Sequence, residues 1–392
     1  MRVMLSTFGS RGDVEPVVAL AVRLRELGAE VAVSAPPDFA ETLAGVGVPL
    51  VAIGPPVRSF VGGDRPPTPA DALKLAAGLL DERFGTIAKA AEGCDVLLAT
   101  GLMPAGIREV AGKLGVPYVF ASLQTYGLPA RHYGEDVTDT RRERDEAAVQ
   151  RANMLYGEPL NAHRAALGLP PVDNVRDHVY TERPWLAADP VLNDAAHLTG
   201  VVQTGAWILP DSRPLSPELE SFLDAGEPPV YVGFGSMPMR SADTAHVAVE
   251  AVRAQGRRVL LASGWADLAA TDDGDDYFVV GEVNQQVLFT RVAGVVHHGG
   301  AGTTTTAARA GAPQVVVAQM GDQPDFADRV AELGIGVAHD GPVPTVASLS
   351  EALATALAPA MRTRAAEVAG TIRADGADTA ARLLFKLAGK TV

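Results

Sequence analysis

Short apolar runs alternate with helical patterns along the first half of the chain. The apolar runs have the length of buried strands and cover residues 3–7, 31–34, 50–53, 96–100 and 118–122. Between them, apolar residues recur at helical spacing over residues 17–27, 39–46, 70–91 and 104–114. Such an alternation predicts a parallel sheet covered by helices.

The same alternation restarts after Pro228. Strands are predicted over residues 230–233, 258–262, 277–280, 292–297 and 314–318, and helices over 244–255, 303–310 and 326–333. Three prolines between residues 208 and 217 suit a connector. We therefore predict a first domain over residues 1–204, a linker over 205–225, a second doubly wound domain over 226–377, and a C-terminal helix over 378–392 with Asp378 as its N-cap.

Length and charge narrow the possible functions. A chain of 392 residues exceeds the size of one growing core, and 47% hydrophobic with 20% charged residues is an ordinary globular composition. The net charge of −14 opposes binding to nucleic acid and to anionic membranes. Cys94 is the only cysteine, and no apolar stretch is long enough for a signal peptide or a membrane span, so a cytoplasmic protein is expected.

The strongest chemical signal is the run from His297 to Thr306, which reads HHGGAGTTTT and joins an apolar strand to a helical pattern. Glycines let the backbone approach a ligand closely, and a helix N-terminus offers unpaired N–H groups to an anion. The threonines at 303 and 304 could add hydroxyl donors, and a histidine one ring N–H. The alternative is a plain strand-to-helix turn with Thr303 as N-cap.

Two further loops of the second half follow predicted strands. Gly233-Phe234-Gly235-Ser236 is either a phosphate contact or a simple turn. Asp322 and Gln323 supply a carboxylate and an amide, as recognition of sugar hydroxyls requires, or form an ordinary loop. The acidic run 272–276 lacks the spacing and terminal glutamate of a calcium loop, and no metal site is predicted.

Asp13 follows the first strand, in Gly9-Ser10-Arg11-Gly12-Asp13. It is either the N-cap of the next helix or a general base that faces an interdomain cleft. Two long loops at strand ends, over residues 54–69 and 124–144, are candidates for an acceptor site. The second contains Tyr126, His132 and Tyr133.

With these motifs, the chain resembles the nucleotide-sugar-dependent glycosyltransferases of GT-B fold, and is most similar to those that act on vancomycin-type glycopeptide antibiotics. The similarity extends beyond the loops above to five further motifs, HRAALGLPP (163–171), TERPW (181–185), QTGAW (203–207), Gly264-Trp265 and GEVN (281–284). It implies an α/β protein of two Rossmann-like domains that face an interdomain cleft. Ser263 stands where the family carries arginine, and Phe326 where it carries asparagine, which leaves the donor sugar and base open.

The resemblance also implies roles for individual residues. Asp13 would activate an acceptor hydroxyl for direct, inverting attack on the sugar, without a metal or a cofactor. The acceptor would be a glycopeptide aglycone, which Tyr126, His132 and Tyr133 could face. The thymidine or uridine diphosphate donor would be contacted by Ser10, Arg11, Ser236, Val283, His298, Gly300, Gly302, Thr303, Asp322 and Gln323.

Two other functions remain open at this point. A nucleotide-sugar epimerase or phosphorylase would use the same scaffold but needs additional acid–base groups. A non-catalytic nucleotide-sugar sensor requires residues 297–306 but has no use for Asp13.

Overall fold

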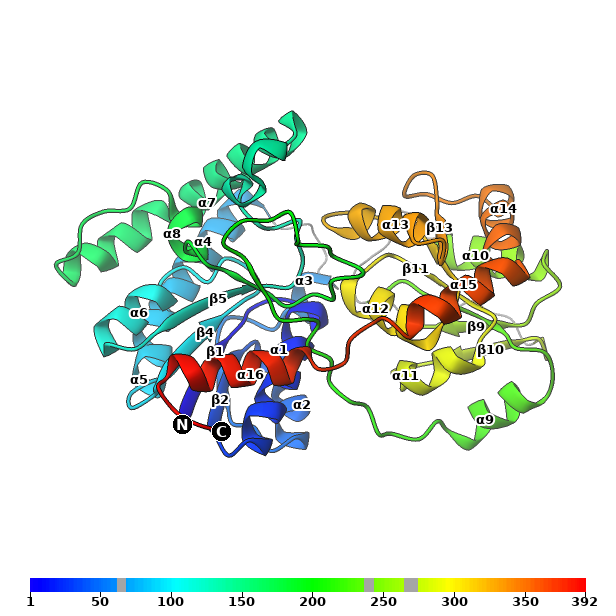
Figure 1. Cartoon of the computed structure of the whole chain (residues 1–392), viewed down its shortest axis with the longest axis horizontal. Helices are drawn as coiled ribbons and strands as arrows, with labels where there is room; N and C mark the ends of the chain where they lie inside the picture. The colour runs from blue at the N-terminus through cyan, green and yellow to red at the C-terminus, as the bar shows by residue number, and fades with distance from the viewer. Residues whose placement is uncertain (62–67, 236–242, 264–273) are drawn as a thin grey trace. The chain divides into compact units, whose positions relative to one another are not determined.

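The computed structural model describes residues 1–61, 68–235, 243–263 and 274–392, and divides them into two compact units (Figure 1). The first unit contains residues 1–190, 194–209 and 373–392, and the second contains 191–193 and 210–372. Each unit is built on one parallel sheet, as the sequence pattern predicts.

The sheet of the first unit has seven strands in the order β3-β2-β1-β4-β5-β6-β7. Every pairing is parallel, which requires a crossover between successive strands. The strand bounds are β1 Arg2–Ser6, β2 Glu30–Ala35, β3 Leu50–Ala52, β4 Val96–Ala99, β5 Tyr118–Ser122, β6 Trp185–Leu186 and β7 Val202–Gln203.

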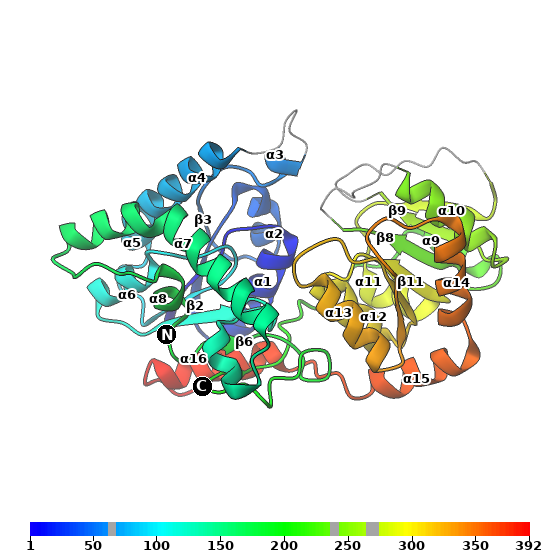
Figure 2. The ribbon, with the colours of Figure 1, turned by 90° about the horizontal axis from the view of Figure 1, so that it is seen from above.

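Helices cover both faces of this sheet (Figure 2). One face packs Met4, Leu97 and Ala99 against helices α4 to α6, and helix α1 lies on the other. The helices are α1 Arg11–Glu26, η1 Pro37–Phe39, α2 Ala40–Gly45, α3 Arg58–Val61, α4 Pro69–Glu82, the π-helical turn η2 Arg83–Ile87, α5 Ala88–Ala90, α6 Ile107–Leu114, η3 Ala130–Asp136, α7 Asp139–Ala166, α8 Val175–Tyr180 and α16 Gly376–Leu387.

The sheet of the second unit has six parallel strands in the order β10-β9-β8-β11-β12-β13. Its strands are β8 Val230–Gly233, β9 Val259–Ala262, β10 Tyr277–Val280, β11 Gly294–His297, β12 Gln314–Val316 and β13 Gly336–Ala338. Its helices are α9 Pro217–Asp224, α10 Thr244–Arg253, α11 Gln285–Leu288, η4 Phe289–Arg291, α12 Ala301–Ala310, α13 Gln323–Glu332, α14 Val346–Ala356 and α15 Pro359–Ala369.

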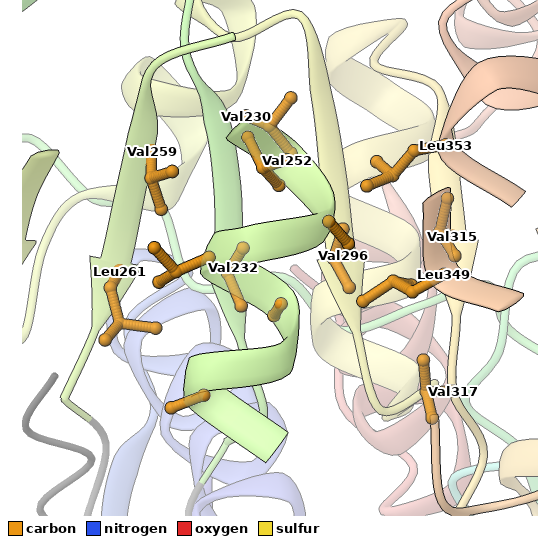
Figure 3. Packing of buried hydrophobic residues seen from close by; sticks show 14 of the residues in the cluster. Val230, Val232, Val252, Val259, Leu261, Val296, Val315, Val317, Leu349 and Leu353 are labelled. Atoms are coloured by element: carbon orange, nitrogen blue, oxygen red, sulfur yellow. The ribbon is translucent and has the colours of Figure 1, made fainter. Parts of the chain in front are cut away.

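The core of the second unit lies on both faces of its sheet. Figure 3 shows Val232 and Val296 of adjacent strands packed with Val252 of α10 and Leu349 of α14. The opposite face is buried under α9, α11 and α12, where Leu219, Leu288 and Ala307 meet. Both faces of the sheet are therefore covered by helices. In such a sheet, ligands bind beyond the carboxyl ends of the strands.

The C-terminal helix belongs to the first unit, which the sequence did not reveal. Helix α16 lies along α1 (Figure 1), and Asp378 pairs with Arg23 at 2.6 Å. The segment at Gly205, which leaves the first unit, packs closely against the segment at Gly376, which returns to it. A Cβ on Gly376 would stand 2.3 Å from Ala206 O, so glycine is needed there. Asp378 is not the N-cap, because α16 begins at Gly376 and Asp375 takes that position.

Two other predictions about connections are wrong in part. The expected linker over residues 205–225 contains helix α9, whose Leu219 and Leu223 are buried in the second unit. The expected loop over 124–144 contains η3 and the first turns of α7. Of the loop 54–69, residues 62–67 lie outside the described residues.

The docking of α16 makes a testable contribution to stability. Leu384 is fully buried in this helix, and Leu387 in its last turn is 47% exposed. We expect Leu384→Ala to lower the free energy of unfolding by about 2–5 kcal/mol through the cavity it leaves. Leu387→Ala is the control and should change it by less than about 0.5 kcal/mol in urea unfolding. Equal effects of the two variants would contradict the docking.

Candidate functional site

The strand order of the second unit reverses between β8 and β11. The chain leaves β8 toward β9 on one side and leaves β11 toward β12 on the other, and the two strands pair with His297 opposite Gly233. Ligands of open parallel sheets bind in the crevice at such a switch point, beyond the carboxyl ends of the strands. The loops after β8, β11 and β12 are the ones predicted from the sequence to hold the donor.

Helix α12 directs its N-terminus into this edge of the sheet. Its N-cap is Gly300, which has no side chain to cap the helix, and the first intrahelical bond joins Thr304 N–H to Gly300 O at 2.9 Å. The N–H groups of residues 301–303 consequently have no intrahelical acceptor. The uncapped N–H groups of this ten-residue helix, together with its positive end, suit an anion at the switch point.

His297 holds the turn and does not face a ligand. It is fully buried, and its Nδ1 accepts a hydrogen bond from the Gly299 N–H at 3.0 Å. The proton therefore lies on Nε2, which donates to Gln314 Oε1 at 2.9 Å. Burial lowers the pKa of His297 to about 3, so the ring is neutral and structural.

The His298 ring packs against the backbone of Gly235 and Gly300. A Cβ on Gly235 would stand 2.6 Å from His298 Cε1, and one on Gly300 would stand 2.5 Å from His298 Nε2. The loops after β8 and β11 therefore converge around this ring. Burial lowers the pKa of His298 to about 4, and a neutral ring has one N–H to donate. In the described part of the chain, neither ring nitrogen has a hydrogen-bond partner.

The threonines of the motif differ in whether their hydroxyls are engaged by the helix backbone. Thr304 is buried and its hydroxyl donates to Gly300 O at 2.9 Å, so the prediction that it could contact phosphate is wrong. Thr306 likewise donates to Gly302 O. The Thr303 hydroxyl forms no hydrogen bond with a described residue. A Cβ on Gly302 would meet nothing within 4 Å, so its surroundings leave room for a ligand.

Asp322 and Gln323 lie beside this turn. A Cβ on Gly299 would stand 3.0 Å from Gln323 O, which shows how closely the two loops pack. Gln323 Oε1 accepts the N–H groups of Gln319 and Met320 at 2.8 and 3.1 Å, so only its amide N–H groups are left to donate. Asp322 is the N-cap of α13, and burial raises the pKa of its carboxyl to about 6.

Other predicted donor contacts have mixed outcomes. Val283 packs partly buried against the core beside α11, which lies next to α12. The neighbouring Asn284 is structural, because it caps α11 and its amide donates to Asp211 O and Arg213 O at 2.9 and 2.8 Å. Ser236 lies outside the described residues.

In the first unit, Asp13 lies on the first turn of α1. The helix begins at Arg11, and Ser10 is its N-cap, so the alternative in which Asp13 is the N-cap is wrong. Asp13 Oδ2 accepts the Ser10 N–H at 2.9 Å, and a Cβ on Gly9 would stand 2.1 Å from this oxygen. Arg11 pairs with Glu15 at 2.6 Å. The carboxylate is thus fixed by the backbone of residues 9–10.

The predicted acceptor residues are mostly core residues. His132 is 3% exposed, and its Nδ1–H donates to Thr199 O at 2.8 Å. Tyr133 is 7% exposed, and its hydroxyl donates to Thr125 O at 2.8 Å. Neither side chain reaches solvent, so the prediction that they face an acceptor is wrong. Tyr126, half-buried under the guanidinium of Arg144, is the one of the three that stays a candidate.

The described residues offer neither a metal-binding cluster nor a membrane-spanning helix. They contain no group of three or more histidine, cysteine or acidic side chains able to hold a metal ion. Over the same part of the chain, no helix combines the length and apolar character needed to cross a membrane.

Two doubly wound parallel sheets, each in its own unit, define the GT-B fold. The solved glycotransferase of kitacinnamycin superposes with a TM-score of 0.76 at 22% identity, and covers 98% of both chains. The glycosyltransferase VinC in complex with DTDP gives 0.70 at 19% identity, over 99% of this chain and 100% of that one. At these identities the likeness concerns the fold.

Sequence comparison gives the family. Residues 3–106 match the glycosyltransferase family 28 N-terminal domain, and residues 271–381 match the C-terminal domain of erythromycin biosynthesis protein CIII-like proteins. Three relatives from Amycolatopsis orientalis align along nearly the whole chain. Glycosyltransferase GtfE is 55% identical over 100% of this chain and 98% of its own. Vancomycin aglycone glucosyltransferase is 55% identical and dTDP-epi-vancosaminyltransferase 54%, each over 98% and 97%.

The chain therefore belongs to the family of vancomycin-type glycopeptide glycosyltransferases. None of these three relatives is named as an epimerase or as a sensor, and the alternatives left open by the sequence gain no support.

Burial of Asp322 gives a pH-dependent prediction. Its folded pKa, about 6, exceeds the ordinary 3.8, so the ionised form destabilises the fold as the pH rises through 6. Asp322→Asn should raise the free energy of unfolding at pH 8 by roughly 1–3 kcal/mol, and the gain should vanish near pH 4. Urea unfolding at both pH values measures it, with the exposed Asp328→Asn as control. A less stable variant at pH 8 would contradict this assignment.

Proposed function

We propose that this glycosyltransferase moves a sugar from a thymidine or uridine diphosphate donor to a hydroxyl of a glycopeptide aglycone, with inversion at the anomeric carbon. The uncapped N-terminus of α12, with His298 and Thr303 beside it, carries the proposal. Two relatives, named for glucose transfer to vancomycin aglycone and for transfer of epi-vancosamine from a dTDP donor, support the substrate classes.

The second unit holds the donor in this proposal. The N–H groups of residues 301–303 and the Thr303 hydroxyl bind the diphosphate, whose negative charge the positive end of the helix favours. A neutral His298 adds one N–H without a charge. Asp322 accepts hydrogen bonds from the sugar hydroxyls, and the Gln323 amide donates to them. Ser10, Arg11, Ser236 and Val283 remain proposed donor contacts on the resemblance alone.

Asp13 supplies the base. As the acceptor oxygen bonds to the anomeric carbon, the bond from that carbon to the diphosphate oxygen breaks, and the acceptor proton passes to the Asp13 carboxylate. The electron pair of the broken bond leaves with the diphosphate, where the helix N-terminus stabilises it. A single displacement inverts the anomeric centre. The Ser10 N–H holds Oδ2 and thereby fixes the orientation of the base.

No metal is assigned a role in this step. The charge that develops on the diphosphate is opposed by the N–H groups of α12 and the neighbouring side chains, which are present in the chain itself. Tyr126 is retained as an acceptor contact, since its ring is half-buried in the loop after β5.

The role of Asp13 is tested by Asp13→Asn. Asparagine keeps an oxygen that can accept the Ser10 N–H, so the helix start is preserved while the base is lost. We expect kcat to fall by about 10²–10⁴ while the dissociation constant for TDP changes little. Glu26→Gln, exposed at the end of the same helix, is the control for kinetics and calorimetry. Turnover that survives in Asp13→Asn would exclude Asp13 as the base.

Stereochemistry and metal dependence are tested in one reaction. Vancomycin aglycone is incubated with TDP-glucose or UDP-glucose, both α-linked donors, in the presence and absence of EDTA. We expect a β-linked product in the NMR spectrum of the purified glycoside and the same rate in both conditions. An α-linked product would rule out single displacement, and a rate abolished by EDTA and restored by a divalent cation would rule out metal independence.

A further inference from the structure

The first unit has its own switch point, between β1 and β4. The chain leaves β1 toward β2 and leaves β4 toward β5, in opposite directions across the sheet. The loop after β1 leads into the first turn of α1, which carries Asp13, and the loop after β4 contains Gly101 and Leu102. An acceptor whose hydroxyl reaches Asp13 must therefore lie beside these two loops.

Leu102 is bound directly to the loop of the proposed base. Its N–H donates to Phe8 O at 2.9 Å, and Phe8 precedes Gly9, over which the Asp13 carboxylate lies. Gly101 adopts a left-handed conformation, with φ +77°, and a Cβ there would stand 2.8 Å from Phe8 O. Only glycine allows this approach, so the backbone of Leu102 is fixed beside the Asp13 loop.

The buried guanidinium of Arg83 also fixes the loop after β4. Arg83, in the π-helical turn η2, is 1% exposed, and its Nη1 donates to Met103 O and Ala105 O at 3.0 and 3.1 Å. Burying a guanidinium is costly, and burial lowers the pKa of Arg83. The two carbonyls lie one and three residues after Leu102, so the loop is held on both sides of Leu102.

On this fixed loop, the Leu102 side chain is 57% exposed. A single exposed leucine needs no explanation on a helix surface, where Leu73 and Met154 lie. Leu102 differs because its backbone is held rigidly at the switch point, next to the base. In the strand order β1-β4-β5, its loop also stands between the loops of Asp13 and Tyr126.

We propose that Leu102 is a specificity-determining residue that contacts the apolar, aromatic surface of the acceptor beside the reacting hydroxyl. This inference rests on the proposed function. A rigid aromatic acceptor gains from such a contact because a preformed apolar side chain requires no ordering when the acceptor binds. The contact concerns acceptor binding and leaves the donor site of the second unit unaffected.

The test compares Leu102→Ala and Leu102→Asn with Met154→Ala, an exposed control on α7 that is 62% exposed. The KM for vancomycin aglycone should rise about tenfold in Leu102→Asn and less in Leu102→Ala, from the loss of a partly buried leucine. The KM for the nucleotide-sugar, the affinity for TDP and the melting temperature should match those of the wild type. The control should match in every measurement.

Binding of the aglycone without donor separates this inference from the proposed function. If the wild type binds the aglycone but transfers no sugar, and Leu102→Asn weakens binding about tenfold, the inference stands and the proposed function is wrong. If transfer proceeds and both Leu102 variants keep the wild-type KM for the aglycone, the inference is wrong and the proposed function stands. A wild type that neither binds nor glycosylates the aglycone overturns both.

Discussion

The constraint that organises this protein is the reversal of strand order within a parallel sheet. At β1 and β4, and again at β8 and β11, neighbouring strands send their connections in opposite directions, so no connection covers the carboxyl ends between them. Asp13, the N-terminus of α12 and the exposed Leu102 all lie at these two points. Their chemistry differs, but the topology that leaves them accessible is the same.

Hydrogen bonds between polar groups within each unit keep these loops in place. His297 joins the Gly299 N–H to Gln314, Ser10 N–H holds Asp13, and Arg83 binds two carbonyls in the interior. Each needs a partner with defined geometry, since a buried polar group without one is costly. Loops fixed in this way lose little entropy when a ligand binds.

The sequence predicted the sheets well because buried parallel strands are continuous apolar runs. The predicted spans 118–122, 230–233 and 277–280 coincide with β5, β8 and β10. The two-residue strands β6 and β7 were missed because two residues carry no periodicity. His132 and Tyr133 were misjudged because a polar aromatic side chain looks the same in sequence whether its polar atom meets substrate or a buried carbonyl. The docking of α16 depends on the pair Arg23–Asp378, which are 355 residues apart.

The return of α16 to the first unit means that the second unit is an insertion within the first. The chain passes from one to the other near residue 210 and comes back near residue 372, apart from the short segment 191–193. A unit joined at both of its ends can be exchanged as a single cassette between relatives, with two junctions and an undisturbed host. Recombination at those junctions would exchange the second unit of such an enzyme while the first unit kept both of its own ends.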